Sequence, residues 1–282
     1  MMSQPAAAPL LRPAWGAATD RGTRRAINED SFLAQSPVFM VADGMGGHEA
    51  GEVASALAVE ALRCLVGRPS VTSDQVQQQL LAAQRQIGAL ESLPGRGAGT
   101  TVAGLVLAEQ DAVPYWLVVN LGDSRTYRLA GGLLEQISVD HSEVQERIDG
   151  GSLTVSEAAH DPRRHIVTRA LSAGISLEVD YWLIPMEAHD RMLVCSDGLT
   201  GELTDDAIAA ILLTVGDPQL AAEQLVAAAV AAGGRDNVTV LVIDAGELVD
   251  DDGDDRTAPR AWVADDDGDT LPRVRCAQIV GS

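Results

Sequence analysis

The stretch Val38-Phe39-Met40-Val41-Ala42-Asp43-Gly44 is a run of five apolar residues that ends in an aspartate and a glycine. A short apolar run bounded by turn residues is typical of a buried strand. A second such run, Ser31–Gln35, lies just before it, with Ser36-Pro37 between the two. The two runs therefore predict a hairpin, with a carboxylate held at the end of its second strand.

Working outward, the chain continues with short strands and helices. Four segments have apolar residues at helical spacing and are expected to be helices: Gly51–Leu65, Asp74–Leu90, Asp205–Val215 and Pro218–Ala232. Ser73 and Asp217 are the expected N-caps of the second and the fourth. Seven further strands are expected at Thr101–Ala108, Tyr115–Leu121, Thr126–Leu129, Leu133–Ile137, Val179–Ile184, Met192–Cys195 and Asn237–Ile243.

The order of these elements predicts the fold class. Four strands between Thr101 and Ile137 follow one another without a helix, with turns at Gly122-Asp123-Ser124 and Gly131-Gly132, so we expect one antiparallel run. The expected strands follow one another along the chain with few strand–helix–strand crossovers, and this order argues against a doubly wound parallel sheet. The pattern favours an α+β fold in which two antiparallel sheets pack face to face with helices outside.

The chain of 282 residues is strongly acidic, with 41 Asp and Glu against 20 Lys and Arg. Nucleic-acid binding depends on basic side chains that neutralise phosphates, so we expect no nucleic-acid partner. Apolar residues make up 46% of the chain, which suffices for a buried core. Any phosphate site must be made locally, by metal ions or by placed arginines, because the average field of the protein repels anions.

Composition also predicts the domain organisation. Residues 245–282 hold ten acidic and four basic residues without hydrophobic periodicity, so we expect a disordered acidic tail there. Residues 1–13 are expected to be a flexible N-terminus, and 14–244 one folded domain. Within that domain the segment 142–172 is polar and irregular. It is expected to be a flap over a site or, as an alternative, a plain surface excursion.

Cysteines and apolar segments bear on location. The three cysteines, Cys64, Cys195 and Cys276, are widely spaced and odd in number, so neither a disulfide framework nor a zinc pair is indicated. Residues 1–15 lack the pattern of a signal peptide. The apolar stretch Leu225–Ala232 is far shorter than the roughly 20 residues that a membrane span needs. We expect a cytoplasmic protein without membrane insertion.

Carboxylates recur at the ends of the expected strands. Asp43 and Asp197 follow apolar strands and precede glycines, Asp30 and Asp236 come just before strands, and Asp123 lies between two strands. An Asp-Gly pair on its own is usually a turn. Five such junctions in one chain favour a shared rim of carboxylates instead. Like charges at such a rim need cations, and carboxylate, carbonyl and water ligands suit Mg²⁺ or Mn²⁺.

These residues resemble the metal-dependent protein phosphatases of type 2C, in their bacterial form. The resemblance runs from about Trp15 to Ile243. The motifs that carry it follow in the order of the family: Asp20-Arg21-Gly22 with Arg25-Ala26-Ile27-Asn28-Glu29-Asp30, Val41-Ala42-Asp43-Gly44-Met45-Gly46-Gly47-His48, Gly99-Thr100-Thr101, Asn120-Leu121-Gly122-Asp123-Ser124-Arg125, Cys195-Ser196-Asp197-Gly198-Leu199 and Gly234-Arg235-Asp236-Asn237-Val238-Thr239. The resemblance implies a four-layer α-β-β-α sandwich with the metal site at one edge, and it makes 14–244 the catalytic domain.

The resemblance also implies a ligand set for two ions, Mn²⁺ or Mg²⁺. Asp43 would bridge them, and the Gly44 carbonyl with water would complete the shell of the first. Asp30, Asp197 and Asp236 would serve the second ion. A third, weaker ion of bacterial members would use Asp123 together with Asp197. Glu29 and Asn237 would lie next to these ligands without binding an ion directly.

The implied reaction is hydrolysis of phosphoserine and phosphothreonine in proteins. A water held between the two ions would attack phosphorus in line with the departing oxygen, and Arg25 would bind the phosphate. No nucleophilic side chain is needed. The proton donor for the leaving alcohol stays open, because Met45 stands where a eukaryotic histidine follows Asp-Gly, and His48 is a weak candidate. His141, His160, His165 and His189 are expected to be structural or solvated.

Other classes of protein fit the sequence less well than a metal-dependent phosphatase. A thiol-based phosphatase needs an Arg six positions after its Cys, and Ser70, Gly201 and Ser282 stand at those positions. The acidic clusters near the C-terminus lack the EF-hand pattern. A catalytically weak adaptor is the competing function, although the metal aspartates and Arg25 are all present. The expected partners are phosphorylated proteins and a cognate Ser/Thr kinase, or antagonists of an anti-sigma factor, and the protein is expected to be a monomer.

Overall fold

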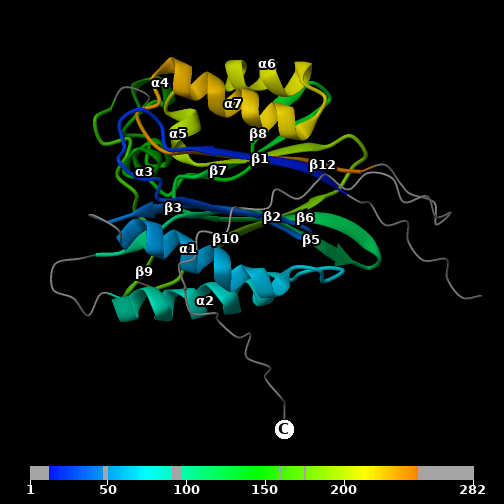
Figure 1. Cartoon of the computed structure of the whole chain (residues 1–282), viewed down its shortest axis with the longest axis horizontal. Helices are drawn as coiled ribbons and strands as arrows, with labels where there is room; N and C mark the ends of the chain where they lie inside the picture. Colours follow the sequence, from blue (N-terminus) through cyan, green and yellow to red (C-terminus); the bar gives the residue numbers. More distant parts are fainter. Residues whose placement is uncertain (1–12, 47–49, 91–96, 159–160, 175, 247–282) are drawn as a thin grey trace, which may run out of the picture.

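The computed structural model describes residues 13–46, 50–90, 97–158, 161–174 and 176–246, and its core is a pair of antiparallel sheets packed face to face (Figure 1). One sheet has the order β1 (Ala14–Asp20), β12 (Val238–Asp244), β11 (Arg191–Cys195), β7 (Arg125–Ala130), β8 (Leu133–Gln136). The other sheet has the order β10 (Asp180–Pro185), β6 (Val113–Leu121), β5 (Val102–Gln110), β3 (Val38–Met45), β4 (Gly99–Thr100), β9 (Leu171–Ser172). Strand β2 (Asp30–Gln35) lies off this path and also pairs with β3. The predicted two-sheet fold is confirmed.

Helices cover the outer face of each sheet (Figure 1). Helix α1 (Ala50–Leu62), which ends in a 3₁₀ turn at Arg63–Leu65, and α2 (Ser73–Leu90) pack on the sheet that contains β3. Helices α6 (Asp205–Thr214) and α7 (Pro218–Ala232) pack on the sheet that contains β12. The order of layers is therefore helix, sheet, sheet, helix.

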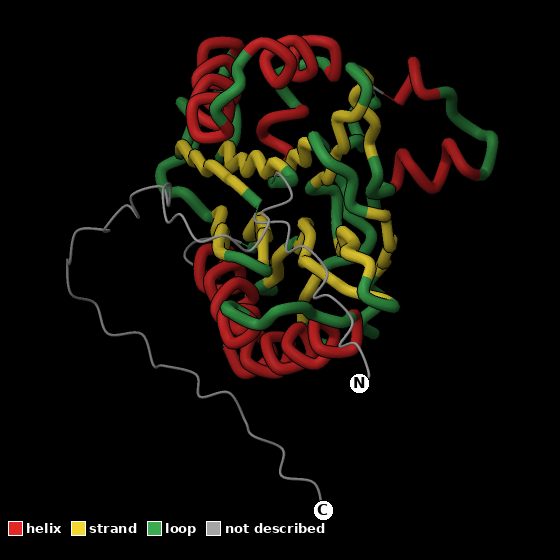
Figure 2. The backbone as a smooth tube through the Cα atoms, turned by 90° about the vertical axis from the view of Figure 1, so that its right-hand side faces the viewer, coloured by secondary structure: helices red, strands yellow, loops and turns green. Residues whose placement is uncertain are grey.

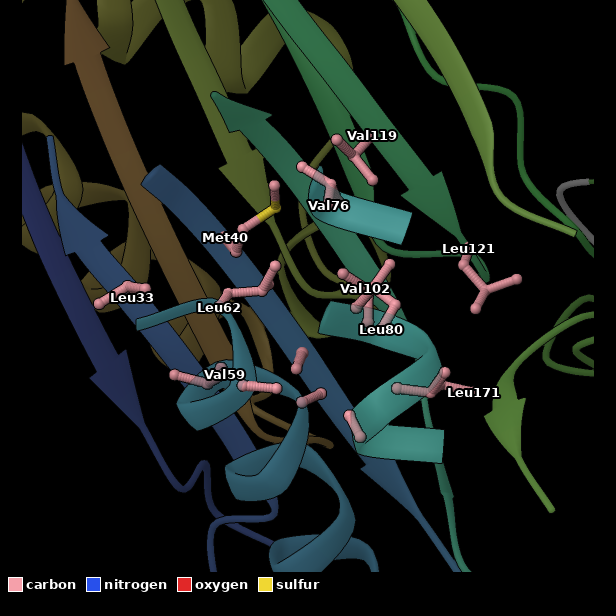
Figure 3. Close-up of a cluster of buried hydrophobic side chains, with 14 of the residues drawn as sticks. Leu33, Met40, Val59, Leu62, Val76, Leu80, Val102, Val119, Leu121 and Leu171 are labelled. Carbon is pink, nitrogen blue, oxygen red and sulfur yellow. The ribbon is translucent and has the colours of Figure 1, made fainter. Parts of the chain in front are cut away.

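Apolar stripes on the helices explain this layering. On α2 the side chains of Val76 and Leu80 are fully buried, and so is Leu62 on α1. Figure 3 shows these three meeting Met40 of β3 and Val102 of β5. Residues at positions three, four and seven apart lie on one face of a helix, so a stripe of this spacing has to be covered by a sheet. A separate apolar layer, which includes Phe39, Trp116 and Ile243, fills the space between the two sheets.

Two helix caps follow from the local sequence, one of them differently from the prediction. The Asp217 carboxylate accepts a hydrogen bond from the N–H of Leu220, as predicted for the start of α7. At α2 the prediction of Ser73 as N-cap is wrong, because the Thr72 hydroxyl accepts from the N–H of Gln75 and the Gln75 side chain accepts from the N–H of Thr72. This reciprocal pair of bonds starts the helix one residue earlier.

The predicted hairpin is confirmed, but the predicted single run of four strands is wrong. Strands β2 and β3 pair from Gln35 opposite Val38 to Asp30 opposite Asp43. Strands β5 and β6 belong to one sheet, whereas β7 and β8 belong to the other. Residues 122–124 therefore cross between the sheets instead of closing a hairpin. Strand β1, which pairs with β12, was not predicted.

The predicted flap segment, 142–172, contains two short helices, α3 (Glu143–Asp149) and α4 (Val155–Ala158), and ends at β9. Figure 2 shows the two helices standing out from the body of the molecule at the right of the view. A bridge between Ser142 and Val167 closes the base of the segment.

The predictions for residues 1–12, His48, His160 and the acidic tail from residue 247 fall outside the described residues. Within the described ranges no helix is both long and apolar enough to cross a membrane.

Candidate metal centre

A cleft of about 710 Å³ opens at one end of the sandwich, and four aspartates from separate places in the sequence are among the residues that line it. Asp43 lies near the end of β3, and Asp123 lies in the crossover after β6. Asp197 opens a short helix, α5 (Asp197–Thr200), just beyond β11, and Asp236 precedes β12. Four residues up to 193 positions apart in sequence thus meet at one rim.

The fifth predicted aspartate, Asp30, is half-buried and is not part of the cleft lining. It pairs with Asp43 across the β2–β3 hairpin, so the register of the hairpin brings the two carboxylates together. The Ser196 hydroxyl donates to one oxygen of Asp30 (Oδ2) at 2.8 Å. The other oxygen, Oδ1, is buried and has no hydrogen-bond donor among the described residues. Asp30 therefore keeps one free acceptor deep in the site.

The glycines after two of the aspartates serve close packing. A Cβ at Gly44 would lie 2.2 Å from the carbonyl oxygen of Gly51, and one at Gly198 would lie 1.9 Å from that of Asn237. Gly44 is part of β3 and Gly198 of α5, so neither pair is the simple turn that Asp-Gly usually marks. Both glycines let the strand ends approach their neighbours closely enough for the carboxylates to face one rim.

The electrostatics of the cluster are unfavourable without a cation. Burial raises the pKa of Asp30 to about 7, and the neighbouring carboxylates Asp197 and Asp236 add to the effect. Burial likewise raises the pKa of Asp123 to about 7, again with Asp197 contributing. Burial, followed by the charge of Asp30, holds the pKa of Asp43 well above its ordinary value. Like charges at close range in a buried site favour protons or metal ions as counter-charges.

The donor set fits divalent cations. Within the described ranges, Asp30 Oδ1 and Glu29 Oε1 are buried oxygens without a hydrogen-bond partner, so each has a lone pair that a cation can use. Carboxylate oxygens are the ligands that Mg²⁺ and Mn²⁺ prefer. In the described part of the chain, no three His, Cys, Asp or Glu side chains close on a single point as a finished cage.

Arg25 projects at the mouth of the same cleft. Its Nη2 donates to Asp236 Oδ2 at 2.7 Å, and about half of its side chain is exposed. Asn237 holds the loop that carries it, because its side-chain amide donates to the carbonyls of Arg21 and Ile27 and its Oδ1 accepts from the N–H of Glu29. A guanidinium beside a carboxylate cluster offers paired donors to an anion that enters the cleft.

The Asp123 crossover is tied to the rest of the site by hydrogen bonds. The Thr101 hydroxyl accepts from the N–H of Asp43 and contacts the Ser124 hydroxyl at 2.8 Å. On the other side, His141 Nδ1 accepts from the N–H of Gly122, and the N–H of His141 donates back to the Gly122 carbonyl. Asp123 is thereby fixed relative to Asp43 and to the base of the flap segment.

Several residues that line the cleft were not predicted to do so, among them one histidine and two arginines. His165 Nδ1 lies 3.7 Å from Asp197 Oδ2, and Arg164 and Arg235 also line the cleft. Arg235 is held by Glu202, which accepts one hydrogen bond from its backbone N–H and two from its guanidinium. His165 and Arg164 come from the flap segment, where no spacing pattern signals a site. Arg235 directly precedes Asp236, and its position in that motif was the one available signal.

The sandwich, the carboxylate rim and the adjacent arginine together define a metal-dependent phosphatase. The model of one family, described as Protein phosphatase 2C, matches residues 20–231. This match spans most of the chain, so the chain belongs to the protein phosphatase 2C family.

Individual relatives agree with this assignment. The serine/threonine phosphatase stp of Listeria monocytogenes is 33% identical over 239 residues, which cover 80% of this chain and 93% of the relative. The serine/threonine protein phosphatase PstP of Mycobacterium tuberculosis is 38% identical over 275 residues, which cover 92% of this chain but 50% of that protein. A solved structure of the catalytic domain of PstP in complex with two manganese ions has a TM-score of 0.73 and 36% identity, covering 84% of this chain and all of that one.

Proposed function

We propose that the protein hydrolyses phosphoserine and phosphothreonine esters in other proteins with the help of divalent metal ions. The observation that carries this proposal is the meeting of Asp43, Asp123, Asp197 and Asp236 at one rim, with Asp30 paired to Asp43 across the hairpin and Arg25 beside Asp236. Family membership and the names of the relatives support it. The presence of all five aspartates argues against the alternative, a catalytically weak adaptor.

The aspartates have separate tasks in this proposal. Asp43, with the carbonyl of Gly44, would hold a first ion and share a second with Asp30, Asp197 and Asp236. Asp123 and Asp197 would hold a third ion more weakly. Bound ions of this kind supply a polarised water as nucleophile and neutralise phosphate charge. Both Mn²⁺ and Mg²⁺ suit oxygen ligands, and Glu29, whose Oε1 is buried without a hydrogen bond in the described structure, would orient water next to them.

Arg25 would bind the phosphate itself. Its hydrogen bond to Asp236 orients the guanidinium before the substrate arrives, so little side-chain freedom has to be lost on binding. The planar fork then offers two donors to two phosphate oxygens, on which charge develops during phosphoryl transfer.

The partners proposed here are phosphorylated proteins and the Ser/Thr kinase that modifies them. We also propose that the protein is a cytoplasmic monomer. The wide spacing of its cysteines fits a reducing compartment, and its acidic composition disfavours binding to nucleic acid.

The test is phosphate release from p-nitrophenyl phosphate and from a phosphothreonine peptide, with Mn²⁺ and with EDTA. We expect strong Mn²⁺-dependent activity that is lost in Asp43→Asn, because that change removes the shared ligand. Asp111→Asn is the matched control, since this exposed aspartate lies in the β5–β6 turn and undergoes the same loss of charge. If the folded, metal-loaded wild type releases no phosphate from either substrate, the phosphatase function is contradicted and the adaptor function is favoured.

A further inference from the structure

Thr101 contacts two of the segments that carry carboxylates into the cleft. It lies between β4 and β5, beside the end of β3, because β4 pairs with β3. Its N–H donates to the Asp43 carbonyl at 2.9 Å, and its hydroxyl accepts from the Asp43 N–H at 3.0 Å. The Thr100 hydroxyl donates to the same carbonyl at 2.9 Å. The backbone of Asp43 is therefore fixed through both of its polar groups.

The side chain of Thr101 also reaches the crossover that carries Asp123. Its hydroxyl contacts the Ser124 hydroxyl at 2.8 Å, the ordinary length of an O–H···O hydrogen bond. A Cβ at Gly122 would lie 2.5 Å from the methyl carbon of Thr101, so the glycine leaves the space that this methyl group occupies. The residue before Asp123 and the residue after it thus both contact one threonine.

Both hydroxyls of this pair are shielded from water. Thr101 is 1% exposed and Ser124 is 0% exposed. A buried hydroxyl that loses its partner cannot turn to water instead, so the contact between the two is costly to break. On its other side the crossover is held by His141, which bonds both the N–H and the carbonyl of Gly122. The crossover therefore has little freedom to move relative to β3.

We propose that the Thr101 and Ser124 hydroxyls are a positioning pair, which sets the affinity for the weaker ion by holding Asp123 at a fixed place relative to Asp43. The inference rests on the metal site of the proposed function. Neither hydroxyl has to bind an ion for this effect. Residues that orient the ligands of a metal change its affinity through the geometry of those ligands.

The experiment measures Mn²⁺ binding to the full-length, metal-depleted protein by isothermal titration calorimetry, with hydrolysis of p-nitrophenyl phosphate measured in parallel. In wild type we expect a tight class of two ions and a weak class of one. Ser124→Ala removes one hydroxyl of the pair and leaves the bonds between Thr101 and Asp43 in place. We expect it to weaken binding of the weak ion about tenfold and to leave the tight class within about twofold, because partners outside the ligand set typically change metal affinity by about 10–100-fold.

Two substitutions of Thr101 separate its hydroxyl from its methyl group. Thr101→Val keeps the methyl group against Gly122 and removes the hydroxyl, so both classes of site are expected to weaken, because the Asp43 N–H also loses its acceptor. Thr101→Ser keeps the hydroxyl and is expected to retain both affinities. Adding Ser124→Ala to Thr101→Val should weaken the weak class no further, since two changes at one bond are not additive.

Ser138→Ala is the matched control. The buried Ser138 hydroxyl accepts from the N–H of Thr126, two residues after Ser124, so this change removes another buried hydroxyl next to the same crossover. It is expected to lower Tm, as Ser124→Ala does, without changing either affinity for Mn²⁺. Thermal unfolding in EDTA measures this loss of stability separately from metal binding.

The outcomes separate the proposals. An unchanged weak class in Ser124→Ala, or an equal loss in Ser138→Ala, overturns the positioning role. A single class of sites in wild type overturns it as well, and so does a larger loss in Thr101→Ser than in Thr101→Val, which would assign the effect to packing of the methyl group. Absence of Mn²⁺-dependent phosphate release from p-nitrophenyl phosphate by wild type overturns the phosphatase function, whereas the binding isotherms still decide the positioning role.

Discussion

Arg25 is the residue whose chemistry is most specific in the cleft. Its guanidinium carries several donors in one plane, and Asp236 uses one of its terminal nitrogens at 2.7 Å. A lysine in its place would keep the charge but would lose the planar fork. A comparison of the two side chains therefore separates attraction of an anion from oriented binding of a phosphate.

We expect Arg25→Ala to lower kcat/KM for a phosphothreonine peptide roughly 100-fold, and Arg25→Lys roughly tenfold, because removing a donor that stabilises the transition state costs about 10²–10³ in rate. Steady-state kinetics at saturating Mn²⁺ measure both. Arg24→Ala is the control, since this neighbouring arginine is exposed and does not line the cleft. Equal losses in Lys and Ala variants would contradict bidentate binding, and a loss in Arg24→Ala would point to a general charge effect.

At the scale of residues, the sequence predicted the aspartates at the strand ends, but it did not predict the cleft residues that come from the flap segment. Asp43 and Asp197 stand out because an apolar run ends in Asp-Gly, and their convergence follows once the strands are antiparallel. Arg164 and His165 reach the cleft only because the chain returns to it after α3 and α4, and no local sequence pattern predicts that return. The close approach at Gly44 and Gly198 also depends on tertiary packing, so the turn interpretation of Asp-Gly was incomplete.

At the scale of elements, the packing of α7 on β1 depends on one small residue. Gly16 of β1 faces the start of α7, and a Cβ there would lie 2.2 Å from the Cα of Gln219. The Gln219 side chain also bonds the backbone of Ala17 in both directions, as acceptor from its N–H and donor to its carbonyl. The helix is thus held against the backbone of the strand, and it has no room to accept a methyl group without moving.

Gly16→Ala is therefore expected to destabilise the protein by about 2 kcal/mol, within the usual range for overpacking. For a domain of this size that corresponds to a fall in Tm of roughly 4–8 °C. The matched control is Gly216→Ala, because a Cβ at Gly216 meets nothing within 4 Å. Thermal unfolding of the metal-loaded proteins measures both. A Tm of Gly16→Ala equal to that of Gly216→Ala would show that α7 moves away freely, contrary to the expectation.

The elements that were predicted correctly have strong local signals. Helix α7 has Asp217, Pro218 and a closing Gly233-Gly234, and the β2–β3 hairpin has two apolar runs around one short turn. Strand β1 has mostly alanine, glycine and threonine, so its pairing with β12 had to come from tertiary context. The local sequence does not predict that the chain changes sheets at residues 122–124, because a crossover and a hairpin turn use the same residue types.

At the scale of the whole molecule, the acidic site makes stability depend on pH and on metal. The pKa of Asp30 and that of Asp123 are raised to about 7, and the pKa of Asp43 is held well above its ordinary value. A raised carboxyl pKa means that the folded state binds more protons than the unfolded state between about pH 4 and pH 7. The free energy of unfolding of the metal-free protein must therefore fall as pH rises through that window. The lowered pKa of Asp161, beside Arg163, has the opposite sign but acts only below about pH 4.

In EDTA we therefore expect Tm to fall by at least about 4 °C between pH 5 and pH 8, the shift that roughly 1–2 kcal/mol produces in a domain of this size. Saturating Mn²⁺ should raise Tm most at pH 8, since the ions take the place of the protons that the site has lost. Asp43→Asn removes one carboxylate of the rim, so its metal-free Tm should fall less with pH than that of wild type, and Mn²⁺ should stabilise it less. Asp111→Asn loses an equal charge at an exposed turn and should follow wild type. Two results would contradict this expectation: a metal-free Tm of wild type that does not change with pH, or Tm curves of Asp43→Asn and Asp111→Asn that run parallel. Either would mean that the carboxylate rim does not set the pH dependence of stability.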